Sequence, residues 1–218
     1  MTRTVLVTAG PTREAVDPVR YVGNRSSGRM GYAIARAAWR RGADVTLVSG
    51  PVQIDAPPGV EVVAVETAVQ MHAAVSEAIA SADVTVFAAA VSDFRPSAPE
   101  AGKVKRSEVG DEIVLPLTAN PDIARTTGAS RKPGSVTVGF ALETSDLLEN
   151  ARKKLEAKAF DILVANDATE EGSGFDVDTN RVTILTKEGE PEHLPLLSKD
   201  EVAEEILDRV REHLQVDG

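Results

Sequence analysis

Short runs of Val, Leu, Ile and Ala recur along the chain, each bounded by polar or turn-forming residues. These runs are apolar enough to be buried on both faces, which is typical of strands in a parallel sheet. Segments with helical spacing of apolar residues separate most of them, so the pattern predicts alternating strands and helices. The six predicted strands are Thr4–Ala9, Ala43–Ser49, Val60–Val65, Asp83–Ala90, Val136–Ala141 and Asp161–Ala165.

Local signals predict where the helices between these strands begin and end. A helix over Tyr32–Arg41 is stopped by Gly42, which suits the position just past a helix end. Thr67 opens the next helix, and Gln70 three residues later completes a capping box. Two further starts are predicted, with Asn120 as the cap before Pro121, and with Thr144 or Ser145 as the cap before Leu147.

The C-terminal part departs from the strand and helix alternation. Val182–Thr186 and Glu192–Leu197 flank the polar turn 187–190, which predicts a β-hairpin added to the sheet. Ser198–Leu214 predicts a closing amphipathic helix, with Glu201 completing a capping box. The expected fold is therefore an α/β, doubly wound, mostly parallel Rossmann-like sheet with a C-terminal hairpin extension and a closing helix.

The composition narrows the class of protein. The 218 residues, 42% apolar and 4% aromatic, predict one domain over residues 1–218 with an aliphatic core. The chain has no cysteine, which excludes disulfides, thiolate nucleophiles and cysteine zinc sites. A formal charge of −10 argues against nucleic acid as a partner, and any polyanionic ligand must meet a local basic cluster. No apolar run approaches the roughly 20 residues that span a bilayer and no signal-peptide pattern is present, so we expect no membrane partner and a cytoplasmic location.

The connection from Gly10 to Gly31 is the most informative segment. It joins the first predicted strand to the first predicted helix over far more residues than the usual length of about 2–6. It ends in small residues, whose backbone N–H groups can approach an anion at the positive N-terminus of the helix. Phosphate binding is therefore the first hypothesis for this chain.

Two common nucleotide-binding chemistries lack their motifs. A Rossmann dehydrogenase has its glycine fingerprint directly after the first strand and an acidic residue after the second. Here the second strand ends at Ser49–Pro51, and the candidate Gly28–Gly31 comes well beyond Gly10. No tyrosine is followed by lysine four positions later, as short-chain reductases require, and no Walker A loop occurs. Hydride transfer is disfavoured.

Eight segments carry a resemblance to bacterial phosphopantothenoylcysteine synthetase, the second activity of the bifunctional coenzyme A biosynthesis protein. They occur in order along the chain, so together they are far more specific than a single glycine motif. The segments are TAGPTRE (8–14), DPVRY (17–21), NRSSGRMG (24–31), AAAVSDF (88–94), KVKR (103–106), NPDI (120–123), VGFALET (138–144) and AND (165–167).

The resemblance implies a CTP-dependent phosphopantothenate–cysteine ligase. In that reaction 4′-phosphopantothenate and CTP give an acyl-cytidylate and pyrophosphate, and the cysteine amine then displaces CMP. The resemblance also implies Mg²⁺ and a homodimer, and in the bifunctional protein a fused decarboxylase domain. Two alternatives stay open at this point: an NAD(P)-dependent reductase and a noncatalytic nucleotide-binding subunit.

The resemblance also implies site residues. It assigns catalysis to Asn24 and Lys103, and the binding of phosphopantothenate to Asn24, Ser26, Ser27 and Gly28. The nucleotide-binding residues that it implies are Phe87, Ala88, Ala89, Asp93, Lys103, Asn120, Pro121, Asp122, Ile123, Phe140, Lys154 and Lys158. Asp93 is also the candidate magnesium ligand.

Most of these residues have an ordinary structural explanation as well. Asn24 could serve a turn, and residues 26–28 could cap a helix. Lys103 lies in a basic run that solvent alone could account for, although Gly102 and Gly110 could hinge a lid. Lys154 and Lys158 lie four residues apart on one helix, a like-charge pairing that is unfavourable unless an anion compensates.

Overall fold

An eight-stranded sheet forms the centre of the computed structural model, which describes residues 2–143, 145–167 and 177–216. Six strands are parallel, and their order β5-β4-β1-β6-β9-β10 is the 3-2-1-4-5-6 order of doubly wound folds. The hairpin β12–β13 adds antiparallel to β10. The strands of this sheet are β1 (Thr4–Ala9), β4 (Asp44–Ser49), β5 (Glu61–Ala64), β6 (Val84–Phe87), β9 (Val136–Glu143), β10 (Ile162–Asp167), β12 (Thr183–Thr186) and β13 (Glu192–His193).

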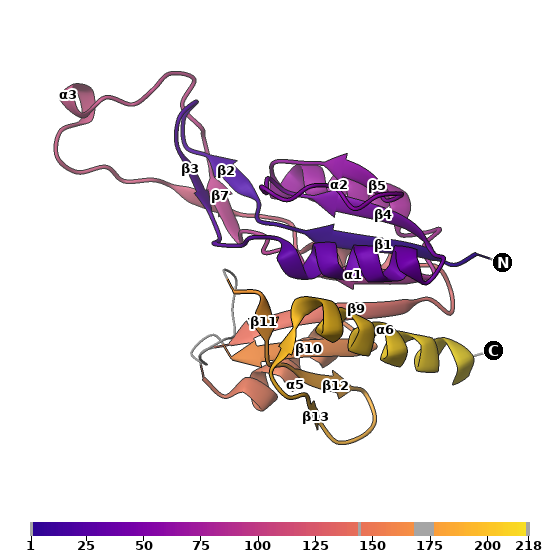
Figure 1. Cartoon of the computed structure of the whole chain (residues 1–218). Coiled ribbons are helices and arrows are strands. Elements are labelled where there is room, and N and C mark those ends of the chain that lie inside the picture. The colour runs from indigo at the N-terminus through magenta and orange to yellow at the C-terminus, as the bar shows by residue number, and fades with distance from the viewer. Residues whose placement is uncertain (1, 144, 168–176, 217–218) are drawn as a thin grey trace.

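Helices cover both faces of the sheet. On one face α1 (Arg29–Arg40) and α6 (Lys199–Val216) lie side by side and bury the largest apolar cluster (Figure 1). On the other face α2 (Ala68–Ala78), α4 (Ile123–Thr127), the 3₁₀ turn η1 (Gly128–Ser130) and α5 (Leu147–Ala157) follow one another along the sheet. No helix within the described ranges is long and apolar enough to cross a membrane. The predicted α/β doubly wound fold is confirmed.

Capping boxes were the most accurate local predictions. Gln70 N–H donates to the Thr67 hydroxyl, and the Gln70 side chain accepts from the Thr67 N–H. Ser198 and Glu201 exchange the same pair of hydrogen bonds at the start of α6. These contacts need only three residues of sequence separation, so the local pattern determines them.

Other predicted boundaries are wrong. Asn120 does not cap a helix beginning at Pro121, because Asp122 takes the cap position and accepts the N–H of Arg125. Asp146, in a left-handed conformation, precedes α5 in place of Ser145, and Thr144 lies outside the described residues. The second strand of the hairpin ends early, since Pro195 has no N–H for the ladder. Leu197 instead lies in β14 (Leu197–Ser198), which pairs with β11 (Thr179–Asn180).

Two small ribbons extend from the carboxyl end of the sheet (Figure 1). Within the β1–α1 connection, β2 (Arg13–Ala15) pairs with β3 (Tyr21–Gly23). After β6, β7 (Phe94–Pro96) pairs with β8 (Leu117–Ala119). Residues 97–116 between β7 and β8 form an arm that reaches away from the body and carries the short helix α3 (Arg106–Val109).

Candidate functional site

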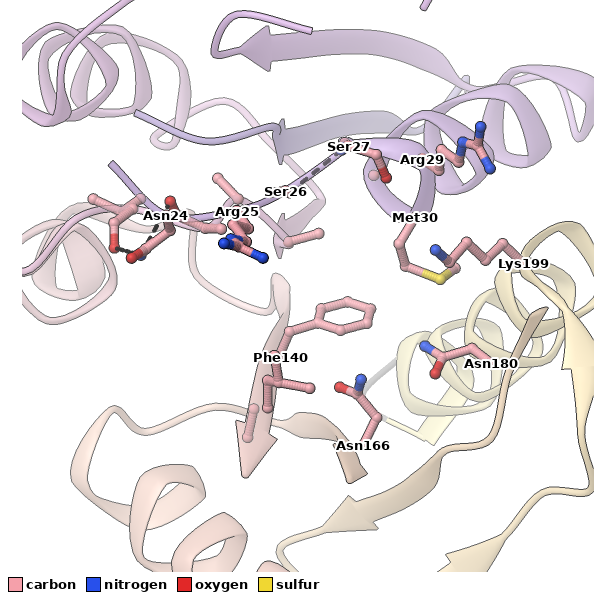
Figure 2. Close-up of a pocket in the computed structure, with 18 of the residues that line it drawn as sticks. Asn24, Arg25, Ser26, Ser27, Arg29, Met30, Phe140, Asn166, Asn180 and Lys199 are labelled. Carbon is pink, nitrogen blue, oxygen red and sulfur yellow. Dashed lines mark hydrogen bonds between the residues drawn. The ribbon is translucent and has the colours of Figure 1, made fainter. Parts of the chain in front are cut away.

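A cleft of about 460 Å³ lies at the carboxyl ends of β1, β6, β9 and β10. This is the edge at which doubly wound sheets bind ligands, next to the point where the strand order reverses between β1 and β6. Residues 24–31, 88–91 and 140–142 form most of its wall. Figure 2 shows side chains from the N-terminal half opposite Asn166, Asn180 and Lys199.

The start of α1 forms one wall of this cleft. Gly28 occupies the N-cap position with φ of 76°, a left-handed conformation that favours glycine. A Cβ on Gly31 would lie 2.5 Å from the Cβ of Ala9, so glycine lets the helix approach β1 closely. The first turn of α1 contains no acidic residue. The first N–H groups of the helix have no partner within the helix, so together with the helix dipole they favour an anion here.

The N-cap position of α1 is held by Gly28, not by either serine of this loop. The N-cap has no side-chain hydrogen bond, and the Ser26 hydroxyl accepts the Gly28 N–H at 3.3 Å. Ser26 and Ser27 both line the cleft. Both residues therefore face the space that a ligand in this cleft would occupy.

Asn24 lies at the mouth of the cleft, held by its side-chain amide. Its Nδ2 donates to the carbonyl of Val91 at 3.0 Å and more weakly to that of Ala90 at 3.4 Å. The side chain is therefore oriented by the loop that follows β6, not by its own turn. This contact fixes the Asn24 loop against the segment that leads to Asp93.

A second cleft, of about 210 Å³, adjoins the first. The two share Ala89, Val91, Asp93, Phe140 and Lys154. Its lining adds all but one of the remaining residues to which the resemblance assigns the nucleotide, the exception being Lys103. The added residues are Phe87, Asn120, Pro121, Asp122, Ile123 and Lys158. The residues assigned to the nucleotide thus come from four separate chain segments and line two adjoining clefts, which we together call the crevice.

Two lysines give this crevice its positive charge, Lys154 in α5 and Lys158 at the C-cap of the same helix. Burial lowers the pKa of Lys154, and the neighbouring charge of Lys158 lowers it further, while Glu143, Asp93 and Asp122 oppose the shift. Lys158 pairs with Asp122 at 3.2 Å. A bound anion would compensate the repulsion between the two ammonium groups. Lys153, by contrast, is exposed and paired with Glu149.

Four cationic side chains and one carboxylate line the first cleft: Arg25, Arg29, Lys154 and Lys199 against Asp93. Arg29 is paired with Asp178 at 2.5 Å. The cleft still has an excess of basic over acidic side chains, although the chain has a net charge of −10. The low-dielectric walls strengthen the attraction of this cluster for anions. This is the basic cluster that a polyanionic ligand requires.

The donor set also fits a magnesium–nucleotide complex. The described residues contain no group of three His, Asp or Glu side chains that could hold a metal ion by themselves. Mg²⁺ in nucleotide sites is usually held by one or two carboxylates together with the phosphates. Asp93, on the shared wall of both clefts, is the residue that would supply the carboxylate oxygen.

Asn120 has a structural role that the sequence did not indicate. Its N–H donates to the Asp93 carbonyl at 2.8 Å, and its Nδ2 donates to the Ser92 carbonyl at 2.8 Å. Its Oδ1 accepts from Arg95. Asn120 therefore fastens the end of β8 to the loop that carries Asp93.

The structure places Lys103 apart from the other candidates. It is exposed on the arm and lines neither cleft. Sequence reasoning also missed three residues of the opposite wall, Asn166, Asn180 and Lys199 (Figure 2). Asn166 lies within the AND segment, which is a signal that could have found it, but Asn180 and Lys199 lie in no such segment.

The family model of the DNA/pantothenate metabolism flavoprotein C-terminal domain matches residues 1–214. The chain belongs to this family. It is 44% identical over 210 residues to the coenzyme A biosynthesis bifunctional protein CoaBC of Vibrio cholerae serotype O1, covering 96% of this chain and 52% of that protein. Identity to the CoaBC protein of Bacillus subtilis is 45% over 207 residues, covering 94% and 50%.

The chain spans about half the length of these curated relatives. The crystal structure of the C-terminal domain of a CoaBC protein superimposes with a TM-score of 0.82 at 41% identity, covering 98% of this chain and 96% of that one. That this chain belongs to the flavoprotein C-terminal domain family confirms its resemblance to the synthetase domain. The family's Rossmann-like fold is the fold observed here.

Proposed function

We propose that this protein ligates 4′-phosphopantothenate to L-cysteine at the expense of CTP. The observation that carries the proposal is that the two clefts adjoin and share Asp93, Phe140 and Lys154. One cleft offers a helix N-terminus and small polar residues for a phosphate, and the other offers paired lysines for a nucleotide. A ligand in each would meet at the shared wall.

The chemistry needs two displacements. A carboxylate oxygen of phosphopantothenate attacks the α-phosphorus of CTP, the bond to the bridging oxygen breaks, and pyrophosphate leaves. The cysteine amine then attacks the acyl carbon, loses a proton, and expels CMP as the amide forms. Such reactions depend mainly on positioning the anions and neutralising their charge.

Protein groups at the crevice suit these two demands. Lys154 and Lys158 would neutralise the triphosphate, and Asp93 would hold Mg²⁺, which supplies further charge neutralisation when bound. The Asn24 amide would stabilise negative charge on the reacting acyl group without competing as a nucleophile. Lys103 would act on the closed complex, once the arm approaches the crevice.

The proposal includes a homodimer. The two ribbons expose apolar side chains, with Val19 62%, Tyr21 53%, Phe94 54% and Leu117 47% accessible. Apolar groups gathered on a projecting element favour association with a partner of similar character. Sedimentation analysis should give twice the mass of the chain, and Phe94→Asp should shift the species to the monomer. A monomeric wild-type protein would remove this part of the proposal.

Pyrophosphate release tests the activity. With CTP and phosphopantothenate the enzyme should release pyrophosphate, and CMP should accumulate together with amide only when cysteine is added. A noncatalytic subunit would bind CTP and release nothing. A reductase would be stabilised against heating by NADPH instead of CTP, since a ligand at a hundred times its Kd adds about 2.7 kcal/mol.

A matched pair of variants tests the location of the nucleotide. Lys154→Gln should weaken CTP binding, because a half-buried charge in the crevice is lost. Lys153→Gln removes an exposed lysine one residue away and should leave binding unchanged. Equal effects of the two substitutions on the calorimetric Kd would place the nucleotide elsewhere.

A further inference from the structure

Beyond its base, the arm contacts the β2–β3 connection at Glu100 and at Val104. The Glu100 N–H donates to the Val16 carbonyl at 2.9 Å. Every residue from 101 to 119 is exposed except Val104, which is half-buried. Beyond that residue, Lys105 pairs with Glu108 and Arg106 pairs with Asp111, so these charged groups satisfy one another within the arm. The contacts of Val104 are therefore the attachment nearest to Lys103, the residue just before it.

Asp17 and Arg20 hold both polar groups of the Val104 backbone. The Val104 N–H donates to Asp17 Oδ2 at 3.1 Å, and Arg20 Nη2 donates to the Val104 carbonyl at 3.0 Å. Arg20 also donates to the same carboxylate oxygen through Nε at 3.0 Å and Nη2 at 2.5 Å. We call these contacts the Asp17 clamp.

The carboxylate at the centre of this clamp is buried and ionised. The Asp17 side chain is 0% exposed. The hydrogen bond from the Arg20 guanidinium, together with backbone N–H groups, holds the pKa of Asp17 well below its usual range despite burial. Its Oδ1 accepts the N–H groups of Val19 and Arg20, both at 2.8 Å, which closes the turn between β2 and β3.

The clamp lies between the two candidate catalytic residues. Arg20 is followed by β3 and then by Asn24, whose amide is fixed to Val91. On the other side of the clamp, Val104 adjoins Lys103. We propose that Asp17 is a positioning residue that fixes the segment carrying Lys103 relative to the loop carrying Asn24, an inference that rests on the proposed ligase function.

Asp17→Asn separates the two functions of this side chain, which are to hold Val104 through Oδ2 and to close the β2–β3 turn through Oδ1. An asparagine carbonyl in place of Oδ1 keeps the bonds from Val19 and Arg20. Its NH₂ group then replaces Oδ2 and faces the Val104 N–H and the Arg20 guanidinium, where no acceptor remains. Asp111→Asn is the matched control, since it makes the same chemical change on the arm in an exposed ion pair.

The experiment measures arm protection and turnover in parallel. In Asp17→Asn, hydrogen exchange should accelerate in the peptide that covers residues 100–116, kcat should fall by roughly a hundredfold, and the Kd for CTP should stay near the wild-type value. The melting temperature should fall, because a buried and ion-paired carboxylate is lost, but the variant should remain folded at the assay temperature. Asp111→Asn should behave as wild type in kcat. Normal kcat in Asp17→Asn, or a lost kcat without faster exchange in the arm, would overturn the inference.

A double variant shows whether Asp17 acts through Lys103. If it does, Asp17→Asn should not slow the Lys103→Gln enzyme further, because the group that it positions is already absent. Additive losses, or a collapse of the melting temperature and of CTP binding in Asp17→Asn, would make Asp17 a fold residue only. A wild-type protein that releases no pyrophosphate would overturn the ligase function itself, whereas an active wild type beside an equally active Asp17→Asn overturns only the inference.

Discussion

Gly28→Ala tests whether the start of α1 is shaped for a ligand. Alanine in a left-handed conformation costs about 1–2 kcal/mol relative to glycine, and Gly28 has φ of 76°. The new Cβ would also lie 2.7 Å from Cγ1 of Val52, a contact that is too short to keep. An overpacked methyl typically costs about 1–3 kcal/mol. We therefore expect a loss of about 2–5 kcal/mol in the free energy of unfolding.

Thermal unfolding and phosphopantothenate titration together measure this effect. The left-handed strain alone should lower the melting temperature by roughly 2–8 °C, at about 2–4 °C per kcal/mol for a chain of this size. Affinity for phosphopantothenate should fall too, because the displaced backbone N–H groups no longer face the cleft. Adding Val52→Ala to Gly28→Ala should recover the part of the stability loss that comes from the short Cβ–Cγ1 contact. The part that comes from the left-handed backbone should remain.

A control glycine completes the design. Gly128 has a helical φ of −57°, and a Cβ there would meet nothing within 4 Å, so Gly128→Ala should be neutral or slightly stabilising. Gly28→Ala with a wild-type melting temperature and affinity would refute the geometry assigned to this loop. If Val52→Ala restored the melting temperature completely, the backbone strain argument would be refuted. The short contact with Val52 would then account for the whole loss.

Three further predictions concern the other parts of the molecule. Asn24→Ala should fold normally and lose roughly a hundred- to a thousandfold in amide formation, as for removal of an oxyanion donor; near-normal turnover would contradict its role. Lys103→Gln should keep the melting temperature, because the side chain is exposed on the arm, while steady-state synthesis falls steeply; normal synthesis would return Lys103 to a solvated surface residue. Burial opposes the ionisation of Asp83, but hydrogen bonds from Lys132 and Thr4 lower its pKa from 3.8 to about 2. The ionised Asp83 therefore stabilises the folded state above pH about 4, and this stabilisation is lost as the pH falls through about 2. Because Lys132 is half-exposed, that contribution to stability is about 1–2 kcal/mol. Asp83→Asn should therefore make the free energy of unfolding less dependent on pH in the acid range. An unchanged pH dependence would contradict this prediction.

The sequence predicted what short-range chemistry determines. The strand Thr4–Ala9 and the Thr67 and Ser198 capping boxes were correct because their evidence lies within a few residues. Asn120 was assigned wrongly as a cap, since its hydrogen bonds go to Ser92, Asp93 and Arg95 across the β7–β8 ribbon. These partners lie 25 or more positions away in the sequence, so no local pattern reveals them. The local preference of Asn-Pro for a helix start therefore led to the wrong assignment.

The same distinction explains which wall of the cleft the sequence could predict. The residues of the N-terminal half come from the β1–α1 connection and the β6 exit, where glycine spacing and strand ends mark a ligand edge. Asn180 and Lys199 lie at a short strand and at a helix start, positions where asparagine and lysine are ordinary, yet both side chains are buried at the cleft. They reach it because α6 packs beside α1 and places its first residue, Lys199, at the carboxyl edge of the sheet. Closure of the fold, not local sequence, therefore supplies the second wall, and a substitution that loosens α6 from α1 would alter the site without touching any residue that the motifs identify.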